Sequence, residues 1–170
     1  MFNLFIEYLT AIGVPWLRLY CGLFHEFVPW VAAVEETGKF LIVGKGNTPI
    51  SFTSIPEVAA YLAHVLTTVP RARLSNIELR IEGQRASLSE LGELYTASTA
   101  LKTPVLVEHV DALPLPVGDN RGYLQAKFAL GAGSSGWDCV EERDNEALAR
   151  SGNALWEGHR WEGVKEVLRL

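Results

Sequence analysis

The sequence contains little cysteine. Its 170 residues include only Cys21 and Cys139, whereas small secreted domains that depend on disulfides are dense in cysteine. The four histidines stand at positions 25, 64, 109 and 159, and neither they nor the cysteines follow the short spacings of a metal site. We therefore expect no disulfide scaffold and no bound metal, and a reducing, cytoplasmic location is the default.

Long apolar runs and an excess of positive charge are also missing. No segment reaches the roughly 18 to 20 uninterrupted apolar residues of a membrane-spanning helix, and the apolar stretch over residues 1–30 lacks the basic start of a signal peptide. The formal net charge is −5 and the lysines and arginines are scattered, so no basic stripe tracks a phosphate backbone. We expect no membrane partner and no direct binding of nucleic acid.

What remains is the composition of an ordinary folded domain. Hydrophobic residues make up 48% and charged residues 21% of the chain, which is typical of a soluble globular protein and unlike a disordered one. A chain of this length removes roughly 70% of its unfolded surface from water in one core. A single domain is therefore expected.

The chain opens on a helix and a strand. Apolar residues recur over 2–11 at the three-and-four spacing of one helix face. Gly13 supplies a left-handed stop, and residues 14–21 favour a strand. An aromatic helix face needs a sheet to cover it, and one strand is too little. We therefore expect structure upstream of residue 1, and we expect partial exposure or self-association of Phe2, Phe5 and Leu9.

Strands and helices then alternate. Apolar or alternating segments predict strands at 39–43, 50–52, 77–81 and 105–109. Capping boxes predict helix starts at Ser54 and Ser87, paired with Glu57 and Glu90. Helices are also predicted at 145–150 and 162–170, and residues 123–130 favour a helix but also permit a strand.

Two of these segments predict which side chains are buried. The helix after Ser54 should bury one face, formed by Val58, Leu62, Val65 and Leu66. The helix after Ser87 should bury Leu91, Leu94, Tyr95 and Leu101. The strand at 77–81 should have one solvent-exposed face, formed by Glu78, Arg80 and the adjoining Glu82.

The glycine-rich segment 131–136 matches the dinucleotide-binding pattern letter for letter. That pattern needs a buried strand before it and a helix starting within it, so that the phosphate meets the helix amino terminus. Residues 125–128 and 137–139 do not provide these elements. We interpret the segment as a glycine-terminated helix followed by a loop.

Cys21 and His25 suggest a thiol activated by a base, but a packed cysteine at a strand end is the interpretation we prefer. His64 stands alone and is interpreted as a core or rim residue. Trp156 and Trp161 are interpreted as an apolar clasp on the domain.

The loop after the first strand is the candidate binding site. Ligands of α/β proteins lie outside the carboxyl ends of strands, and this loop combines a glycine for clearance with aromatic rings that can stack on a planar group. The alternative is that its aromatic residues only cover the core. The candidate substrate-binding residues are Tyr20, Gly22, Leu23, Phe24, Phe27 and Trp30.

The order of several segments resembles the NmrA-like and isoflavone-reductase-like branch of the atypical short-chain dehydrogenases, especially its fungal members. The resemblance covers nearly the whole chain but only the second half of the family. It is carried by Ile6–Trp16, Gly22–Phe24, Gly44–Ser54, Glu57–Leu66 and Ala154–Trp161.

The resemblance implies a fold and an activity. The fold would be an incomplete Rossmann-like α/β fold, with residues 1–30 as its last helix and strand and residues 31–170 as a small substrate-binding α/β subdomain. The activity would be hydride transfer between NADPH and a small aromatic or carbonyl-bearing molecule, with Gly22 and Phe24 beside the cofactor. The family's glycine-rich turn has no counterpart here, and Phe2 stands where the isoflavone-reductase branch has a lysine.

These departures leave several functions open. Phenylalanine cannot move a proton, so the catalytic residues are unknown, and we expect a truncated chain that binds NADP weakly or not at all and is inactive alone. A rival hypothesis is a non-catalytic NmrA-type module that senses dinucleotide or binds a protein partner. A third is a gene fragment without an independent role.

Overall fold

The computed structural model describes residues 2–100 and 103–170. The helices are α1 (Phe2–Ala11), α2 (Val28–Val31), α3 (Val34–Thr37), α4 (Ile55–Thr68), α5 (Leu88–Ala97), α6 (Arg121–Ala129), α7 (Glu146–Ala149) and α8 (Val164–Val167). The strands are β1 (Leu17–Tyr20), β2 (Leu23–Phe24), β3 (Lys39–Val43), β4 (Ile50–Thr53), β5 (Ile77–Arg80), β6 (Gln84–Ala86), β7 (Leu106–Val110), β8 (Trp137–Asp138) and β9 (Arg143–Asp144). Single 3-10 turns are η1 (His25–Phe27), η2 (Arg71–Arg73) and η3 (Asn153–Leu155).

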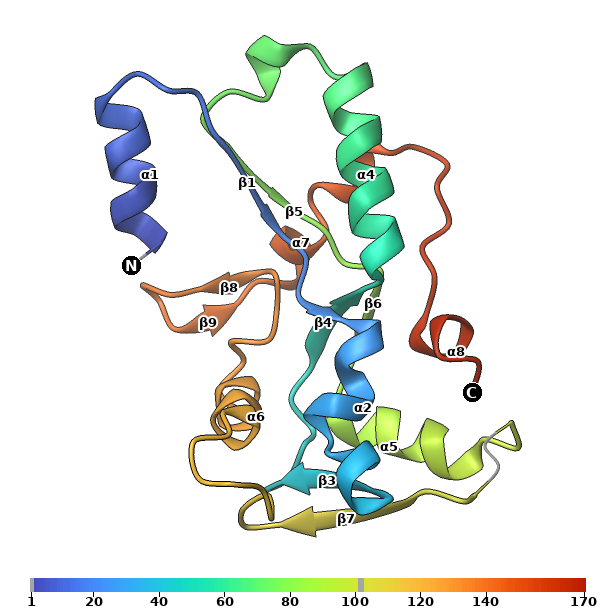
Figure 1. The fold of residues 1–170 in the computed structure, drawn as a ribbon. Helices are drawn as coiled ribbons and strands as arrows, with labels where there is room; N and C mark the ends of the chain where they lie inside the picture. Colours follow the sequence, from blue (N-terminus) through green and yellow to red (C-terminus); the bar gives the residue numbers. More distant parts are fainter. Residues whose placement is uncertain (1, 101–102) are drawn as a thin grey trace.

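Parallel pairing dominates the sheets. Strand β1 pairs with β5, β2 with β4 and β3 with β7, all in parallel. Strand β6 is antiparallel to β4, and β8 and β9 form an antiparallel hairpin. Because parallel strands need a crossover connection, helices separate paired strands in the sequence, as α4 does between β1 and β5 (Figure 1). The α/β class is therefore confirmed.

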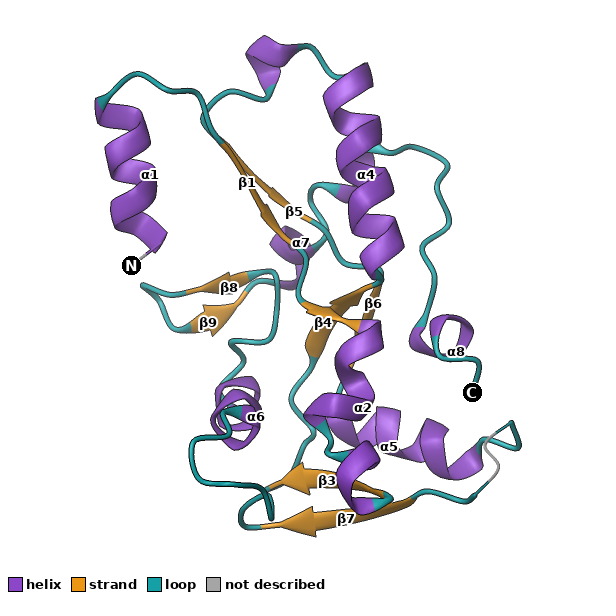
Figure 2. Cartoon of the chain, viewed as in Figure 1, coloured by secondary structure: helices purple, strands orange, loops and turns teal. Residues whose placement is uncertain are grey.

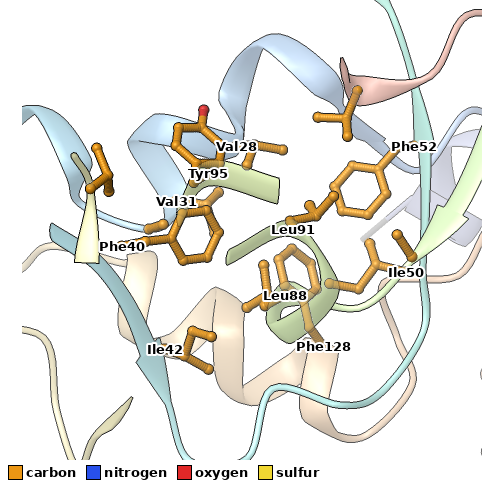
Figure 3. Close-up of a cluster of buried hydrophobic side chains, with 14 residues drawn as sticks. Val28, Val31, Phe40, Ile42, Ile50, Phe52, Leu88, Leu91, Tyr95 and Phe128 are labelled. Carbon is orange, nitrogen blue, oxygen red and sulfur yellow. The ribbon is translucent and has the colours of Figure 1, made fainter. Parts of the chain in front are cut away.

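The main core lies where α2, α5 and α6 meet β3 and β4 (Figure 3). Burial of each large apolar side chain contributes roughly 1.5 to 3 kcal/mol. The fully or almost fully buried members labelled in the figure are Val28, Val31, Phe40, Ile42, Ile50, Phe52, Leu88, Leu91, Tyr95 and Phe128.

A second cluster lies between α4 and β5. Its buried members are Tyr61, Val65, Leu74, Leu79 and Ile81. Trp156 and Trp161, from the segment that precedes α8, pack against it with ring centroids 6.3 and 5.9 Å from that of Tyr61. The predicted apolar clasp is therefore confirmed. His64 belongs to the same rim, with its ring stacked 5.4 Å from that of Trp156.

The predicted capping boxes have different outcomes. Ser87 caps α5, and the side chain of Glu90 accepts a hydrogen bond from the Ser87 amide at 2.7 Å, so this box is complete. Ser54 caps α4 by accepting a bond from the Glu57 amide at 3.3 Å, but Glu57 does not reach back to the Ser54 amide. Its Oε1 atom binds the C-terminal segment instead, which the local sequence could not reveal.

Helix α1 stands apart from the main body of the chain (Figure 1). Its exposed apolar side chains include Leu4, Phe5 and Tyr8, with exposed fractions of 68%, 61% and 61%. Leu9 is half-buried, and the Phe2 side chain lies outside the described residues. A bond from the Trp16 indole to the Thr10 hydroxyl, 3.0 Å long, ties the helix to the segment that precedes β1.

Other expectations need correction. Strand β1 begins at Leu17 and not at residue 14, because Pro15 has no N–H to donate to a ladder. In α4 the buried face includes Tyr61, whereas Leu66 is 63% exposed, because it lines an open groove beside residues 15–17. Glu82 was expected to be solvent-exposed, but its exposed fraction is 5%, because a polar network encloses it. Leu101 lies outside the described residues.

The later predictions agree with the structure where it describes them. The segment 123–130 is helical as part of α6, and α7 and α8 lie within the predicted ranges 145–150 and 162–170. Gly13 has a φ of +70°, as a left-handed stop requires.

Candidate functional site

A cleft of about 360 Å³ opens at the carboxyl end of β1, a volume within the range of small-molecule sites. Its first wall is the chain from Leu19 to Leu23, which includes the predicted residues Tyr20, Gly22 and Leu23. Its second wall comes from α6 and from the loop between α6 and β8 (Figure 2). The residues of the second wall are Leu124, Phe128, Ala132, Gly133, Ser134 and Ser135.

Gly22 lets the end of the first wall approach strand β4. It has a φ of +69°, and a Cβ atom there would lie 2.0 Å from the carbonyl oxygen of Ser51 on β4. No side chain other than hydrogen fits such a backbone approach. The glycine was expected to provide clearance for a ligand, and the structure shows that it provides clearance for β4.

A buried polar network fixes the loop of the second wall. The Ser51 hydroxyl, fully buried, donates to Glu82 Oε2 at 2.5 Å and accepts from the Ser135 amide at 2.9 Å. The Ser135 hydroxyl donates to the Ala149 carbonyl at 2.8 Å. The buried hydroxyls of Ser51 and Ser135 are both paired, and paired buried polar groups hold one conformation, so the loop is fixed at Ser135.

Arg85 balances the charge of this network. Its Nη1 atom lies 2.9 Å from Glu82 Oε2 and donates to the Ser134 hydroxyl at 3.3 Å, and its Nη2 atom pairs with Asp144. Arg150 lies 3.3 Å from the other oxygen of Glu82. The charges of Glu82 and Arg85 are therefore compensated within the protein.

The glycine-rich segment 131–136 does not form a phosphate cradle. It follows the end of α6 and leads into β8, so neither a preceding strand nor a following helix is present. The amides of 131, 132, 134, 135 and 136 donate to protein oxygens, including the carbonyl of Phe128 and the hydroxyls of Ser51 and Ser134. The interpretation as a helix end and loop is confirmed.

Tyr20 lines the cleft and carries two arginine side chains on its ring. The guanidinium carbons of Arg18 and Arg80 lie 4.4 and 4.1 Å from the centre of its ring, which is cation–π geometry. Its hydroxyl donates to Glu78 at 2.9 Å. Burial, followed by the bond to Glu78, raises the pKa of Tyr20 above its ordinary value, so the phenol keeps its proton at neutral pH.

Cys21 and His25 do not form a catalytic pair. Cys21 lines the cleft, whereas His25 is fully buried and its Nε2 atom donates to the Glu162 carbonyl at 3.2 Å. Burial raises the pKa of the Cys21 thiol, so the thiol form is favoured over the nucleophilic thiolate.

The aromatic residues of the loop extend away from the cleft. Phe24, Phe27 and Trp30 do not line it. They form an edge-to-face series, with ring centroids 5.5 Å apart between Phe24 and Phe27 and 6.1 Å apart between Phe27 and Trp30. Phe27 and Trp30 are 43% and 38% exposed. Arg121, whose guanidinium carbon is 5.3 Å from the Trp30 ring centre, supports the series from α6.

Sequence reasoning missed the second wall. Leu124 and Phe128 carry the helical spacing of an apolar stripe, but nothing local indicated that they face β1. Ser134 and Ser135 were noticed only as letters of a nucleotide motif. Ser134 and Ser135 line one cleft with Tyr20 although they lie more than one hundred residues from it in the chain.

The described part of the chain, residues 2–100 and 103–170, contains no group of three or more histidine, cysteine, aspartate or glutamate side chains arranged to hold a metal ion. None of its helices combines the length and apolar character needed to cross a membrane.

Comparison with solved structures identifies the fold. Isoflavone reductase matches with a TM-score of 0.67 at 17% identity, over 98% of this chain and 55% of that chain. AtPrR2 with NADP+ and (+)pinoresinol matches with a TM-score of 0.68 at 16% identity, over 98% and 55%. NmrA, a negative transcriptional regulator, in complex with NADP matches with a TM-score of 0.61 at 15% identity, over 96% and 54%.

The chain therefore has the Rossmann-type α/β fold of the NmrA and isoflavone reductase structures over about half of their length. The expected resemblance is confirmed at the level of the fold. No protein-family model and no curated protein matches the sequence.

Proposed function

We propose that this chain is the substrate side of an NAD(P)-dependent oxidoreductase fold and that its cleft binds a small uncharged molecule. The observation that carries the proposal is the cleft itself, which lies outside the carboxyl end of the parallel strand β1. This is where α/β proteins place their ligands. In this proposal residues 1–30 are the residual Rossmann helix and strand, and residues 31–170 are the substrate-side subdomain.

The lining of the cleft supports a neutral, partly apolar ligand. Leu19, Leu23, Leu124 and Phe128 supply apolar surface, and the hydroxyls of the second wall supply polar contacts. The nearby guanidinium of Arg80 is already bound to Glu78 and to the Ser135 carbonyl. An anionic ligand would therefore have to displace existing partners.

The cofactor proposed for the whole fold is NADP, which is present in two of the matching structures. The residues of this chain fit only part of such a cofactor. Phe24 directly follows the cleft residue Leu23 in the chain but does not line the cleft, and the amides of segment 131–136 are used within the protein. We expect the isolated chain to bind NADPH weakly or not at all, and no catalytic step is assigned to its residues.

Titration of NADPH, followed by its fluorescence, tests the cofactor part of the proposal. We expect no saturable binding at micromolar concentration. Saturable micromolar binding would show that the chain holds the dinucleotide by itself and would refute this part.

A second titration tests the cleft. Acetophenone, a small aryl ketone, is added to 15N-labelled protein and the amide shifts are followed by NMR. We expect shifts around residues 19–23 and 132–135, and we expect Leu124→Trp, which fills the cleft, to abolish them. Leu130→Trp is the matched control, because Leu130 is 66% exposed and does not line the cleft. Shifts that persist in Leu124→Trp would contradict the proposal.

The exposed face of α1 favours a second candidate function, a protein-binding module without catalysis. Leu4, Phe5 and Tyr8 of α1, and Ile12 directly after it, are each at least half exposed, and such apolar patches in soluble proteins mark interaction surfaces. The occupant proposed is a second copy of this chain. Sedimentation velocity should show concentration-dependent association that Phe5→Glu removes and Glu7→Gln preserves. A monomer at all concentrations would contradict self-association.

A further inference from the structure

The hydroxyl of Ser134 accepts two hydrogen bonds but donates none to the described residues. Its Oγ atom accepts from Arg85 Nη1 at 3.3 Å and from the Gly136 amide at 3.0 Å. A serine hydroxyl also carries one O–H donor. Among the described residues no acceptor is bonded to that donor, although Ser134 is only 6% exposed.

The position of Ser134 decides where the donor can be used. The residue lines the same cleft as Tyr20 and Cys21. A buried donor without a partner costs roughly 1 to 3 kcal/mol, so a ligand oxygen that accepts from it gains an interaction the protein does not satisfy alone. The turn with Gly136 and the contact with Arg85 account for the two bonds that Ser134 accepts, but neither uses its hydroxyl proton.

Arg85 strengthens this donor. A hydroxyl whose oxygen accepts from a guanidinium is polarised, and hydrogen bonds in such a chain reinforce one another. The positive charge of Arg85 is itself paired with Glu82 and Asp144. The site therefore offers a polarised neutral donor without an uncompensated positive charge, which suits a carbonyl oxygen better than a carboxylate.

We propose that Ser134, polarised by Arg85, is the hydrogen-bond donor that recognises a neutral carbonyl oxygen on a ligand in the cleft. This inference rests on the proposed function, because it names the chemistry that the same cleft selects. It adds a specificity-determining residue on a loop that resembles a nucleotide motif but serves the ligand's oxygen.

The test compares acetophenone with α-methylstyrene, in which a methylene group replaces the carbonyl oxygen at the same shape. The measured quantity for each probe is the change in Kd between the wild type and Ser134→Ala, so the different water solubilities of the two probes cancel. Loss of one neutral hydrogen bond should weaken acetophenone binding about tenfold. The Kd of α-methylstyrene should stay unchanged, and Ser134→Thr, which retains the hydroxyl, should restore acetophenone binding.

Ser151→Ala is the matched control. It makes the same chemical change at an exposed serine whose hydroxyl donates to the Leu148 carbonyl outside the cleft, and both Kd values should stay as in the wild type. An equal Kd for acetophenone in the wild type and in Ser134→Ala would overturn the inference.

A measurement on the wild type alone covers the case in which Ser134→Ala does not fold. When the Ser134 hydroxyl donates to a ligand, its oxygen becomes a stronger acceptor, so the amide proton of Gly136 should move downfield with acetophenone and not with α-methylstyrene. An unmoved Gly136 signal at saturating acetophenone would overturn the inference. If both probes bind and Ser134→Ala changes neither Kd, only this inference fails. If neither probe binds at the cleft, the proposed function fails as well.

Discussion

Glu57 Oε1 lies 3.0 Å from the Nε2 atom of His159, although the two residues are 102 positions apart. The same carboxylate oxygen accepts from the Glu162 amide at 2.9 Å, and His25 donates to the Glu162 carbonyl at 3.2 Å. The backbone of Glu162 is therefore held through both its amide and its carbonyl. The start of α4 and the loop after β2 together fix the segment that leads to α8.

The first prediction concerns Glu57. Glu57→Ala should lower the free energy of unfolding by about 3 kcal/mol, because a buried carboxylate with several donors is removed and those donors lose their partner. Urea denaturation followed by tryptophan fluorescence measures the change. Glu93→Ala on the exposed face of α5 is the control and should change stability by less than about 0.5 kcal/mol. Equal stability of the two variants would contradict the assigned role of Glu57.

The second prediction is a loss of stability at mildly acidic pH caused by His25. Burial lowers the pKa of His25 below its ordinary value, and the bond to Glu162 and the charges of Glu26 and Glu57 only partly oppose this. With Nε2 donating, the buried Nδ1 atom has no partner, so a second proton would have no acceptor. The unfolded chain therefore binds more protons than the folded chain below a pH of about 6.5.

The sign of this effect follows from linkage. The contribution of His25 is complete above the unfolded pKa and is lost as pH falls through it toward the lower folded pKa. Unfolding free energies at pH 7.5, 6.5 and 5.5 should therefore decrease in that order, and His25→Gln should flatten the decrease. His109→Gln, at an exposed histidine, should keep it. An unchanged slope in His25→Gln would refute the assignment.

The third prediction separates backbone strain from steric clash at Gly22. Gly22→Ala places a Cβ atom 2.0 Å from the Ser51 carbonyl oxygen at a φ of +69°, so the cost should exceed about 2 kcal/mol. Gly13→Ala is the matched control, since Gly13 has a φ of +70° and nothing within 4 Å. It should cost only the strain of about 1 to 2 kcal/mol. Similar costs for both variants would show that β4 moves freely away from Gly22.

The fourth prediction concerns the two thiols, both of which are free. Cys139 is exposed, whereas burial raises the pKa of Cys21 in the cleft. Labelling with a chromogenic disulfide at pH 8 should therefore show a fast phase from Cys139 and a slow phase from Cys21. Cys139→Ser should remove the fast phase, and acetophenone should slow the remaining one. A fast phase that survives in Cys139→Ser would contradict the half-buried position of Cys21.

Elements with local signals were predictable from the sequence. The capping box of Ser87 and Glu90 and the stop at Gly13 depend on neighbouring residues only, and the structure has both. The short strands β8 and β9 were not predicted. They form a hairpin of two strands with two residues each, and its pairing is set by the loops around it. Such short segments carry no periodicity to detect.

The candidate site was predictable in part. The carboxyl end of β1 was named in advance, and Tyr20 and Leu23 do line the cleft. The aromatic residues Phe24, Phe27 and Trp30 were predicted for the same site but extend away from it. Their direction depends on η1 and α2, whose short turns follow from packing on the core and not from the sequence pattern.

The sequence by itself determined the α/β class and the helix starts and indicated the loop after β1 as the candidate site, because capping, hydrophobic period and glycine conformation act over a few residues. Only the tertiary structure decided that Glu82 is buried, that Glu57 holds the C-terminal segment and that Ser134 and Tyr20 line one cleft. These relationships join residues far apart in the chain. Their energies depend on which groups are removed from water together, and that is set by the packing of the whole fold.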